Sequence, residues 1–91
     1  MTSESVTVVN QLGMHARAAA KFVHLATKFQ AQVRVAREAR VMDGKSIMGI
    51  LLLAAARGTT ITISAEGTDE QAALSALVAL VQSGFGEDRA D

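Results

Sequence analysis

The stretch TITISA (residues 60–65) is the most regular alternation of polar and apolar side chains in the chain. A period of two predicts a strand with one face on a hydrophobic core and the other face in water. Gly67 ends this strand, and TDEQ (residues 68–71) has the pattern of a capping box at a helix start. GFG (residues 84–86) ends the helix that follows. The core face of that helix consists of apolar residues at helical spacing, which are Ala73, Leu74, Leu77, Val78 and Val81.

Upstream of this strand, polar–apolar alternation and helical spacing of apolar residues predict the other elements. Alternation predicts strands at residues 6–8 and 31–35 and a short strand at residues 40–42. Helical spacing predicts an amphipathic helix over roughly residues 16–28. A second, short helix is capped by Ser46 and ended by Gly58. Its apolar residues are Ile47, Ile50, Leu51, Ala54 and Ala55. The resulting order β-α-β-β-α-β-α, with half-buried strands, predicts a two-layer α+β sandwich.

Length and composition limit the possible classes of protein. With 91 residues, 49% of them hydrophobic, we expect one domain over residues 1–91, with a core at about 5–86 and a polar tail at 87–91. The absence of cysteine excludes disulfides, cysteine metal sites and thiol catalysis. The longest apolar run, residues 50–56, is far below the roughly 20 residues that span a bilayer, and no secretory signal is visible. We therefore expect a cytoplasmic protein without membrane insertion.

Charge is unevenly distributed although the net charge is zero. Residues 1–50 hold seven basic and three acidic side chains, whereas residues 51–91 hold two basic and six acidic ones. One end of the fold could therefore attract anionic partners, or the two halves could differ by chance. Nucleic acid is a poorer candidate partner, because three Phe with no Tyr or Trp offer little for base stacking.

The segment GMHAR (residues 13–17) lies where the first turn meets the first helix. The N–H groups of Ala16 and Arg17 lack partners at a helix start and form an anion site. Imidazole is largely neutral at cytoplasmic pH and nucleophilic, which suits His15 as an acceptor, and the Arg17 guanidinium matches phosphate oxygens. These residues suggest phosphoryl transfer to nitrogen, although an ordinary loop histidine beside a solvated arginine fits the residues as well. His24 is too far along the helix to share a metal ion with His15, so we expect no metal or organic cofactor.

Two motifs resemble those of a known family. Residues 13–19 (GMHARAA) resemble the active-site signature of HPr, the histidine phosphocarrier of the bacterial phosphotransferase system. Residues 45–51 (KSIMGIL) resemble the family motif around a regulatory serine, at the matching separation. Residues 84–87 are similar to the close of many proteobacterial members. The resemblance covers about residues 5–87 and suggests a nitrogen-branch or kinase-regulated proteobacterial member.

The resemblance implies a fold and a function. The fold is an open-faced β-sandwich, a four-stranded antiparallel sheet covered on one face by three helices. His15 would take a phosphoryl group on Nδ1 from phosphorylated enzyme I and pass it to enzyme IIA domains, while Arg17 balances charge. The chain would be a monomeric carrier rather than an enzyme. Ala18 replaces a family proline, so we expect altered transfer rates rather than loss of the site.

The resemblance also implies a regulatory site and a partner surface. Ser46 matches the serine that an HPr kinase/phosphorylase modifies in some lineages, although it also suits a plain helix N-cap. Apolar residues 47, 48, 51 and 52 cannot all face the core of one short helix. Those left exposed would dock partners, although Leu51 suits ordinary core packing. The expected partner face consists of Ala20, His24, Thr27, Ile47, Met48 and Leu51.

Two other functions use the same residues. A regulatory binding module, whose partners read its phosphorylation state, would also depend on His15. A hydrolase using Ser46 and His15 is a poor candidate, because no acid is expected beside the histidine and the sequence has no nucleophile elbow.

Overall fold

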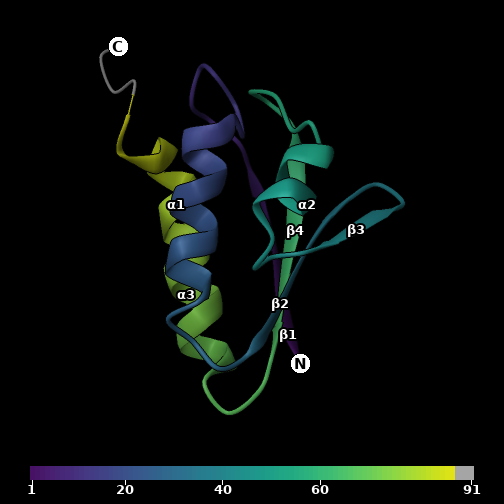
Figure 1. The fold of residues 1–91 in the computed structure, drawn as a ribbon, viewed down its shortest axis with the longest axis vertical. Coiled ribbons are helices and arrows are strands. Elements are labelled where there is room, and N and C mark those ends of the chain that lie inside the picture. The colour runs from purple at the N-terminus through teal and green to yellow at the C-terminus, as the bar shows by residue number, and fades with distance from the viewer. Residues whose placement is uncertain (88–91) are drawn as a thin grey trace.

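The strands and helices follow one another in the predicted order. The computed structural model describes residues 1–87 and is drawn in Figure 1. β1 starts at Thr2 rather than Val6, and the predicted tail beyond Glu87 lies outside the described residues. The elements are β1 (Thr2–Thr7), α1 (Ala16–Ala26), β2 (Gln32–Arg37), β3 (Arg40–Asp43), α2 (Ile47–Leu52), β4 (Thr60–Glu66), α3 (Glu70–Gln82) and the 3-10 turn η1 (Gly84–Gly86).

The four strands form one antiparallel sheet in the order β1-β4-β2-β3. The helices lie on one side of this sheet, with α1 and α3 side by side (Figure 1). Ile61 and Ile63 of β4 are buried beneath the helices, as their alternation predicts. On the other face, hydroxyl groups pair across strands, and Ser5 Oγ lies 3.0 Å from Thr62 Oγ1. The predicted α+β sandwich with one open sheet face is confirmed.

The core lies between the helices and the sheet. Phe22 of α1 is fully buried, and Phe85 of η1 is only 1% exposed. Phe85 therefore fixes the segment after α3 against the domain. Within residues 1–87, no helix is long and apolar enough to cross a membrane. The largest fully buried side chains are Phe22, Phe85, Ile50, Leu53, Ile61, Ile63, Leu77, Val8, Val33, Val35 and Val81.

Helix α1 begins where the sequence predicts and ends slightly earlier. It starts at Ala16 and ends at Ala26, with Thr27 as its C-cap, rather than reaching residue 28. Ala18, which stands at the position of the family proline, is fully buried in the first turn. The helix start therefore forms without proline, in keeping with the high helix propensity of alanine.

Helix α2 is shorter than predicted, and the prediction that Gly58 ends it is wrong. The helix ends at Leu52, and Ala54 already has a left-handed backbone (φ 51°). Arg37 Nη1 donates to the carbonyls of Leu53 and Ala54 at 2.8 and 3.0 Å, and Arg40 Nη1 donates to the Leu52 carbonyl at 2.9 Å. Two guanidinium groups thus satisfy carbonyls that a longer helix would have bonded internally.

The predicted capping box at the start of α3 is also wrong. The N-cap is Asp69, and its carboxylate makes no cap hydrogen bond. It accepts instead from the backbone N–H groups of Gln30 and Ala31, each at 2.8 Å, and the Gln30 bond holds the pKa of Asp69 below its ordinary value. Glu70 Oε1 accepts from the Gly67 N–H at 3.1 Å. Asp69 therefore fastens the α1–β2 loop, whose N–H groups lie within its reach, whereas Glu70 closes its own turn.

Candidate functional site

His15 is the N-cap residue of α1. Its backbone is extended (φ −72°, ψ 178°), and its Nδ1 accepts the Arg17 N–H at 3.3 Å. The N–H groups of Ala16, Arg17 and Ala18 have no acceptor one turn earlier in the helix. Nδ1 therefore lies beside backbone donors at the positive end of a helix dipole, where phosphate oxygens are favoured. The structure thus places the His15 ring beside the Arg17 N–H at the start of α1, and the roles of His15, Ala16 and Arg17 toward phosphate stay a prediction.

The turn that leads to His15 is fixed by close backbone contacts. Gly13 has a left-handed backbone (φ 67°), and the Met14 N–H donates to the Ala55 carbonyl at 2.9 Å. Met14 is itself 5% exposed and belongs to the core. The position of the histidine therefore depends on the packing of this turn against the segment after α2.

The expectation that no acid lies beside His15 is wrong. Glu87 Oε1 is 2.8 Å from His15 Nε2, although the two residues are 72 positions apart. Asn10, which is 2% exposed, donates through Nδ2 to the same Glu87 oxygen at 3.1 Å and to the Gly13 carbonyl at 2.8 Å. Glu87 was assigned to the tail because GFG marks only a helix end. The available signals were an acidic residue directly after GFG and the similarity of residues 84–87 to the close of many proteobacterial members.

The hydrogen bond from His15 holds the pKa of the Glu87 carboxyl below its ordinary value of 4.5. Burial opposes this effect, and the bond from Asn10 adds to it. Since the folded state favours the carboxylate, this contribution to stability is present above pH 4.5 and is lost as pH falls through the lowered pKa. Glu87 is therefore ionised near neutral pH and acts only as a hydrogen-bond acceptor.

Arg17 connects two neighbouring hollows. A hollow of about 420 Å³ is lined by Leu12, His15, Arg17 and Glu87. A second, of about 510 Å³, lies between α1 and the start of α2. The His15 ring and part of the expected partner face thus line neighbouring hollows. The residues that line the second hollow are Arg17, Ala20, Lys21, Val23, His24, Thr27 and Ile47.

The apolar patch expected on α2 is present. Ile47, Met48 and Leu52 are 43%, 68% and 54% exposed, whereas Leu51 is partly buried against the core. Ser46 is the N-cap of α2, and its Oγ accepts the Gly49 N–H at 3.0 Å. Ser46 does not line the His15 hollow, so the two residues do not form the shared site that a hydrolase would need.

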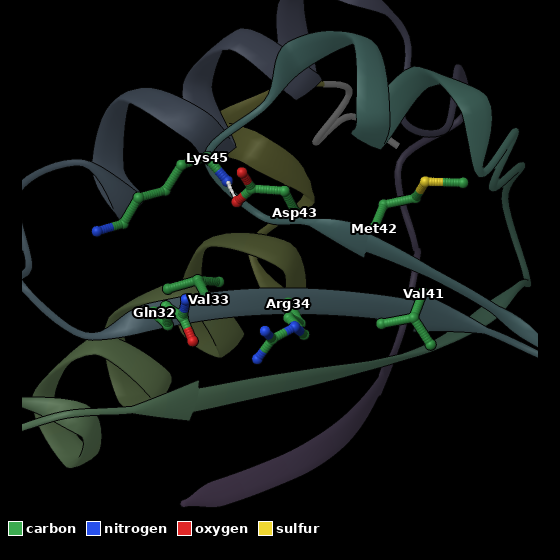
Figure 2. Close-up of a pocket in the computed structure, with 7 residues that line it drawn as sticks. All are labelled: Gln32, Val33, Arg34, Val41, Met42, Asp43 and Lys45. Carbon is green, nitrogen blue, oxygen red and sulfur yellow. Dashed lines mark hydrogen bonds between the residues drawn. The ribbon is translucent and has the colours of Figure 1, made fainter.

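A further hollow of about 310 Å³ lies beside β2 and β3 (Figure 2). It contains no residue of the predicted site. The Lys45 N–H donates to Asp43 Oδ1 at 2.9 Å at its edge, and Lys45 Nζ reaches the Phe29 carbonyl. Asp43 and Lys45 therefore serve to hold the turn after β3. Its lining residues are Gln32, Val33, Arg34, Val41, Met42, Asp43 and Lys45.

Comparison with known proteins gives a consistent answer. Residues 2–83 match the PTS-HPr family model, described as the PTS HPr component phosphorylation site. The chain is 48% identical over 87 residues to phosphocarrier protein HPr of Cupriavidus necator, which covers 96% of this chain and 98% of that protein. It is 42% identical over 82 residues to phosphocarrier protein NPr of Shewanella violacea, covering 90% of each. The crystal structure of HPr-C-His from Thermoanaerobacter tengcongensis superposes with a TM-score of 0.92 at 44% identity, covering 96% of this chain and 98% of that one. Nothing in these comparisons favours the alternative of a regulatory binding module.

Proposed function

Because the chain belongs to the HPr family of phosphocarriers of the phosphotransferase system, we propose that His15 is the residue that carries the phosphoryl group. The donor is phosphorylated enzyme I, charged by phosphoenolpyruvate, and the acceptors are enzyme IIA domains. The observation that carries this proposal is the orientation of the His15 ring. Nδ1 lies 3.3 Å from the Arg17 N–H at the start of α1, and Nε2 lies against Glu87.

The transfer step balances with the groups present. The Nδ1 lone pair forms a bond to phosphorus, while the bond from phosphorus to the donor breaks and its electron pair returns to the donor. The Arg17 N–H loses its contact with Nδ1 when the bond to phosphorus forms. The phosphoryl oxygens then accept hydrogen bonds from the N–H groups in the first turn of α1. The Arg17 guanidinium adds a permanent charge at the same hollow. Since phosphoryl transfer depends mainly on positioning and charge stabilisation, no further catalytic group is needed in the carrier.

Partners dock on the surface beside His15, which we call the docking face. It consists of Ala20, His24, Thr27, Ile47, Met48 and Leu51. Support comes from the hollow between α1 and α2, which Arg17 joins to the His15 hollow. Met48 is flexible and 68% exposed, so it can adapt to more than one partner.

Ser46 is a regulatory phosphorylation site within the same proposal. A phosphate there would add about −1.5 to −2 charges next to Ile47 and Met48. We expect Ser46→Asp to raise the KM of enzyme I for this protein severalfold relative to Ser46→Asn. Asp and Asn are comparable N-caps, so this pair isolates the charge from the cap. Equal KM values would contradict the regulatory role.

The carrier proposal is tested by phosphorylation with cognate enzyme I and phosphoenolpyruvate, followed by intact-mass measurement. We expect a gain of one phosphate, which mild acid removes because a phosphorus–nitrogen bond is acid-labile. His15→Ala should abolish the gain entirely.

His24→Ala is the matched control, since His24 is the only other histidine in the chain. At the end point it should reach the same phosphate gain, because loss of a docking-face residue slows transfer without removing the acceptor nitrogen. A label that survives His15→Ala, or the absence of any label on the unmodified protein, would overturn the proposal.

A further inference from the structure

The contact between His15 and Glu87 places a carboxylate on the ring nitrogen opposite the proposed phosphate acceptor. We propose that Glu87 is a positioning residue, which fixes the tautomer of His15 so that Nδ1 keeps its lone pair. The consequence for phosphoryl transfer rests on the proposed function. The tautomer itself does not, because it belongs to the unphosphorylated protein.

Both ring contacts require the same tautomer. A neutral imidazole has one N–H and one lone pair, and an ionised carboxylate only accepts hydrogen bonds. With Glu87 Oε1 at 2.8 Å, Nε2 must carry the hydrogen. Nδ1 then has the lone pair, and the Arg17 N–H at 3.3 Å donates to it. The opposite tautomer would place two donors together at Nδ1 and leave the carboxylate against a lone pair at Nε2.

The backbone conformation of the segment after α3 places Glu87 beside the His15 ring. Gly84, Phe85 and Gly86 have consecutive left-handed backbones (φ 67°, 59° and 73°), which turn the chain back toward α1. Phe85 is 1% exposed in the core, and Lys21 Nζ of α1 donates to its carbonyl at 2.7 Å. A left-handed backbone is unfavourable for phenylalanine, so this conformation depends on these contacts.

Asn10 completes the arrangement from the other side. Its buried amide donates to both Glu87 Oε1 and the Gly13 carbonyl, which joins the carboxylate to the turn that leads to His15. Glu87 is therefore held by its backbone and by its carboxylate. Such fixed supporting contacts distinguish a positioning residue from a surface ion pair, which holds two mobile side chains.

The fixed tautomer has a consequence for transfer. Only the form with a lone pair on Nδ1 can bond to phosphorus without first losing a proton. After the bond forms, the hydrogen remains on Nε2 and the ring carries a positive charge, which the Glu87 carboxylate offsets. Removal of Glu87 should therefore slow transfer for two reasons: the competent fraction of His15 falls somewhat, and the positive ring loses the carboxylate that offsets its charge.

The test is nitrogen-15 NMR of the two imidazoles, with the pH raised until the ring signals no longer change, so that the neutral form of each ring is compared. His24→Gln assigns the signals. We expect the unmodified protein to hold the hydrogen on Nε2, and Glu87→Ala to shift the tautomer ratio roughly tenfold toward Nδ1–H, the effect of one lost charged hydrogen bond. Glu66→Ala, which removes an exposed carboxylate at the end of β4, should leave the ratio unchanged.

The rate of phosphorylation by enzyme I should fall severalfold in Glu87→Ala, with the folded far-ultraviolet spectrum retained. An unchanged tautomer ratio overturns the inference, whereas a changed ratio with an unchanged rate supports the tautomer and overturns only its consequence for transfer. If the unmodified protein takes up no phosphate, the proposed function fails, while the ratio still decides whether Glu87 orients His15.

Discussion

Gly13→Ala is expected to destabilise the protein by about 2–4 kcal/mol, because left-handed strain and overpacking act together. Gly13 has φ 67°, and a Cβ there would lie 2.7 Å from the Ala55 carbonyl oxygen and 2.9 Å from Ala56 Cα. Both atoms belong to the backbone, so neither can rotate away. The Met14 N–H bond to the same Ala55 carbonyl would be distorted, and His15 would move with it.

The matched control is Gly58→Ala. Gly58 also has a positive φ (90°), but nothing lies within 4 Å of a Cβ built there. We expect the free energy of unfolding of this variant to fall by only about 1 kcal/mol, because of backbone strain alone. Urea unfolding of both variants, monitored by circular dichroism, measures the difference in the free energy of unfolding. Equal losses would show that the contact between Gly13 and residues 55–56 does not constrain the turn.

Local pattern was sufficient to predict most of the fold. The alternation of residues 60–65 predicted a half-buried strand, and β4 occupies Thr60–Glu66 with its isoleucines in the core. The helix start at residue 16 followed from a turn and an apolar stripe, and this placed His15 beside unpaired N–H groups. These features depend on neighbours a few positions apart, which a sequence displays directly.

Features that depend on distant partners could not be predicted in this way. Asp69 bonds to Gln30 and Ala31, 39 and 38 positions away, so the TDEQ pattern at the helix start could not show its role. Glu87 reaches His15 over 72 positions through a turn whose phenylalanine is left-handed. Hydrophobic periodicity and helix-capping motifs do not indicate such contacts, because tertiary packing creates them.

The basic side chains of residues 1–50 also form contacts that the sequence pattern did not predict. Their excess over acidic residues suggested a positive field that attracts anionic partners. Several of these cations donate to main-chain carbonyls: Arg37 and Arg40 to the segment that ends α2, Lys21 to Phe85, and Lys45 to Phe29. Their charge remains, but their positions are set by these structural bonds. Arg17, which lines the His15 hollow, is the basic residue that the proposed chemistry uses directly.

Met48→Asp is expected to weaken the binding of enzyme I by at least tenfold, because truncating or charging a central apolar anchor typically costs 2 kcal/mol or more. Met48 is 68% exposed, and its neighbours Ile47 and Leu52 are 43% and 54% exposed. Such an apolar cluster, on a helix that packs against α1, suits a contact that becomes buried on docking. A carboxylate at its centre would be desolvated without a partner. Initial rates of phosphorylation against protein concentration measure the effect as a rise in KM.

Val41→Asp provides the control, since Val41 on β3 is 57% exposed and lies outside the docking face. Both variants add one negative charge at an exposed apolar site, so long-range repulsion affects both alike. A KM that rises only in Met48→Asp, with kcat and the unfolding midpoint retained, assigns Met48 to docking rather than to chemistry or folding. An equal rise in both variants would mean that net charge, and not this patch, governs recognition. A fall in kcat alone would instead place Met48 against the transferring group.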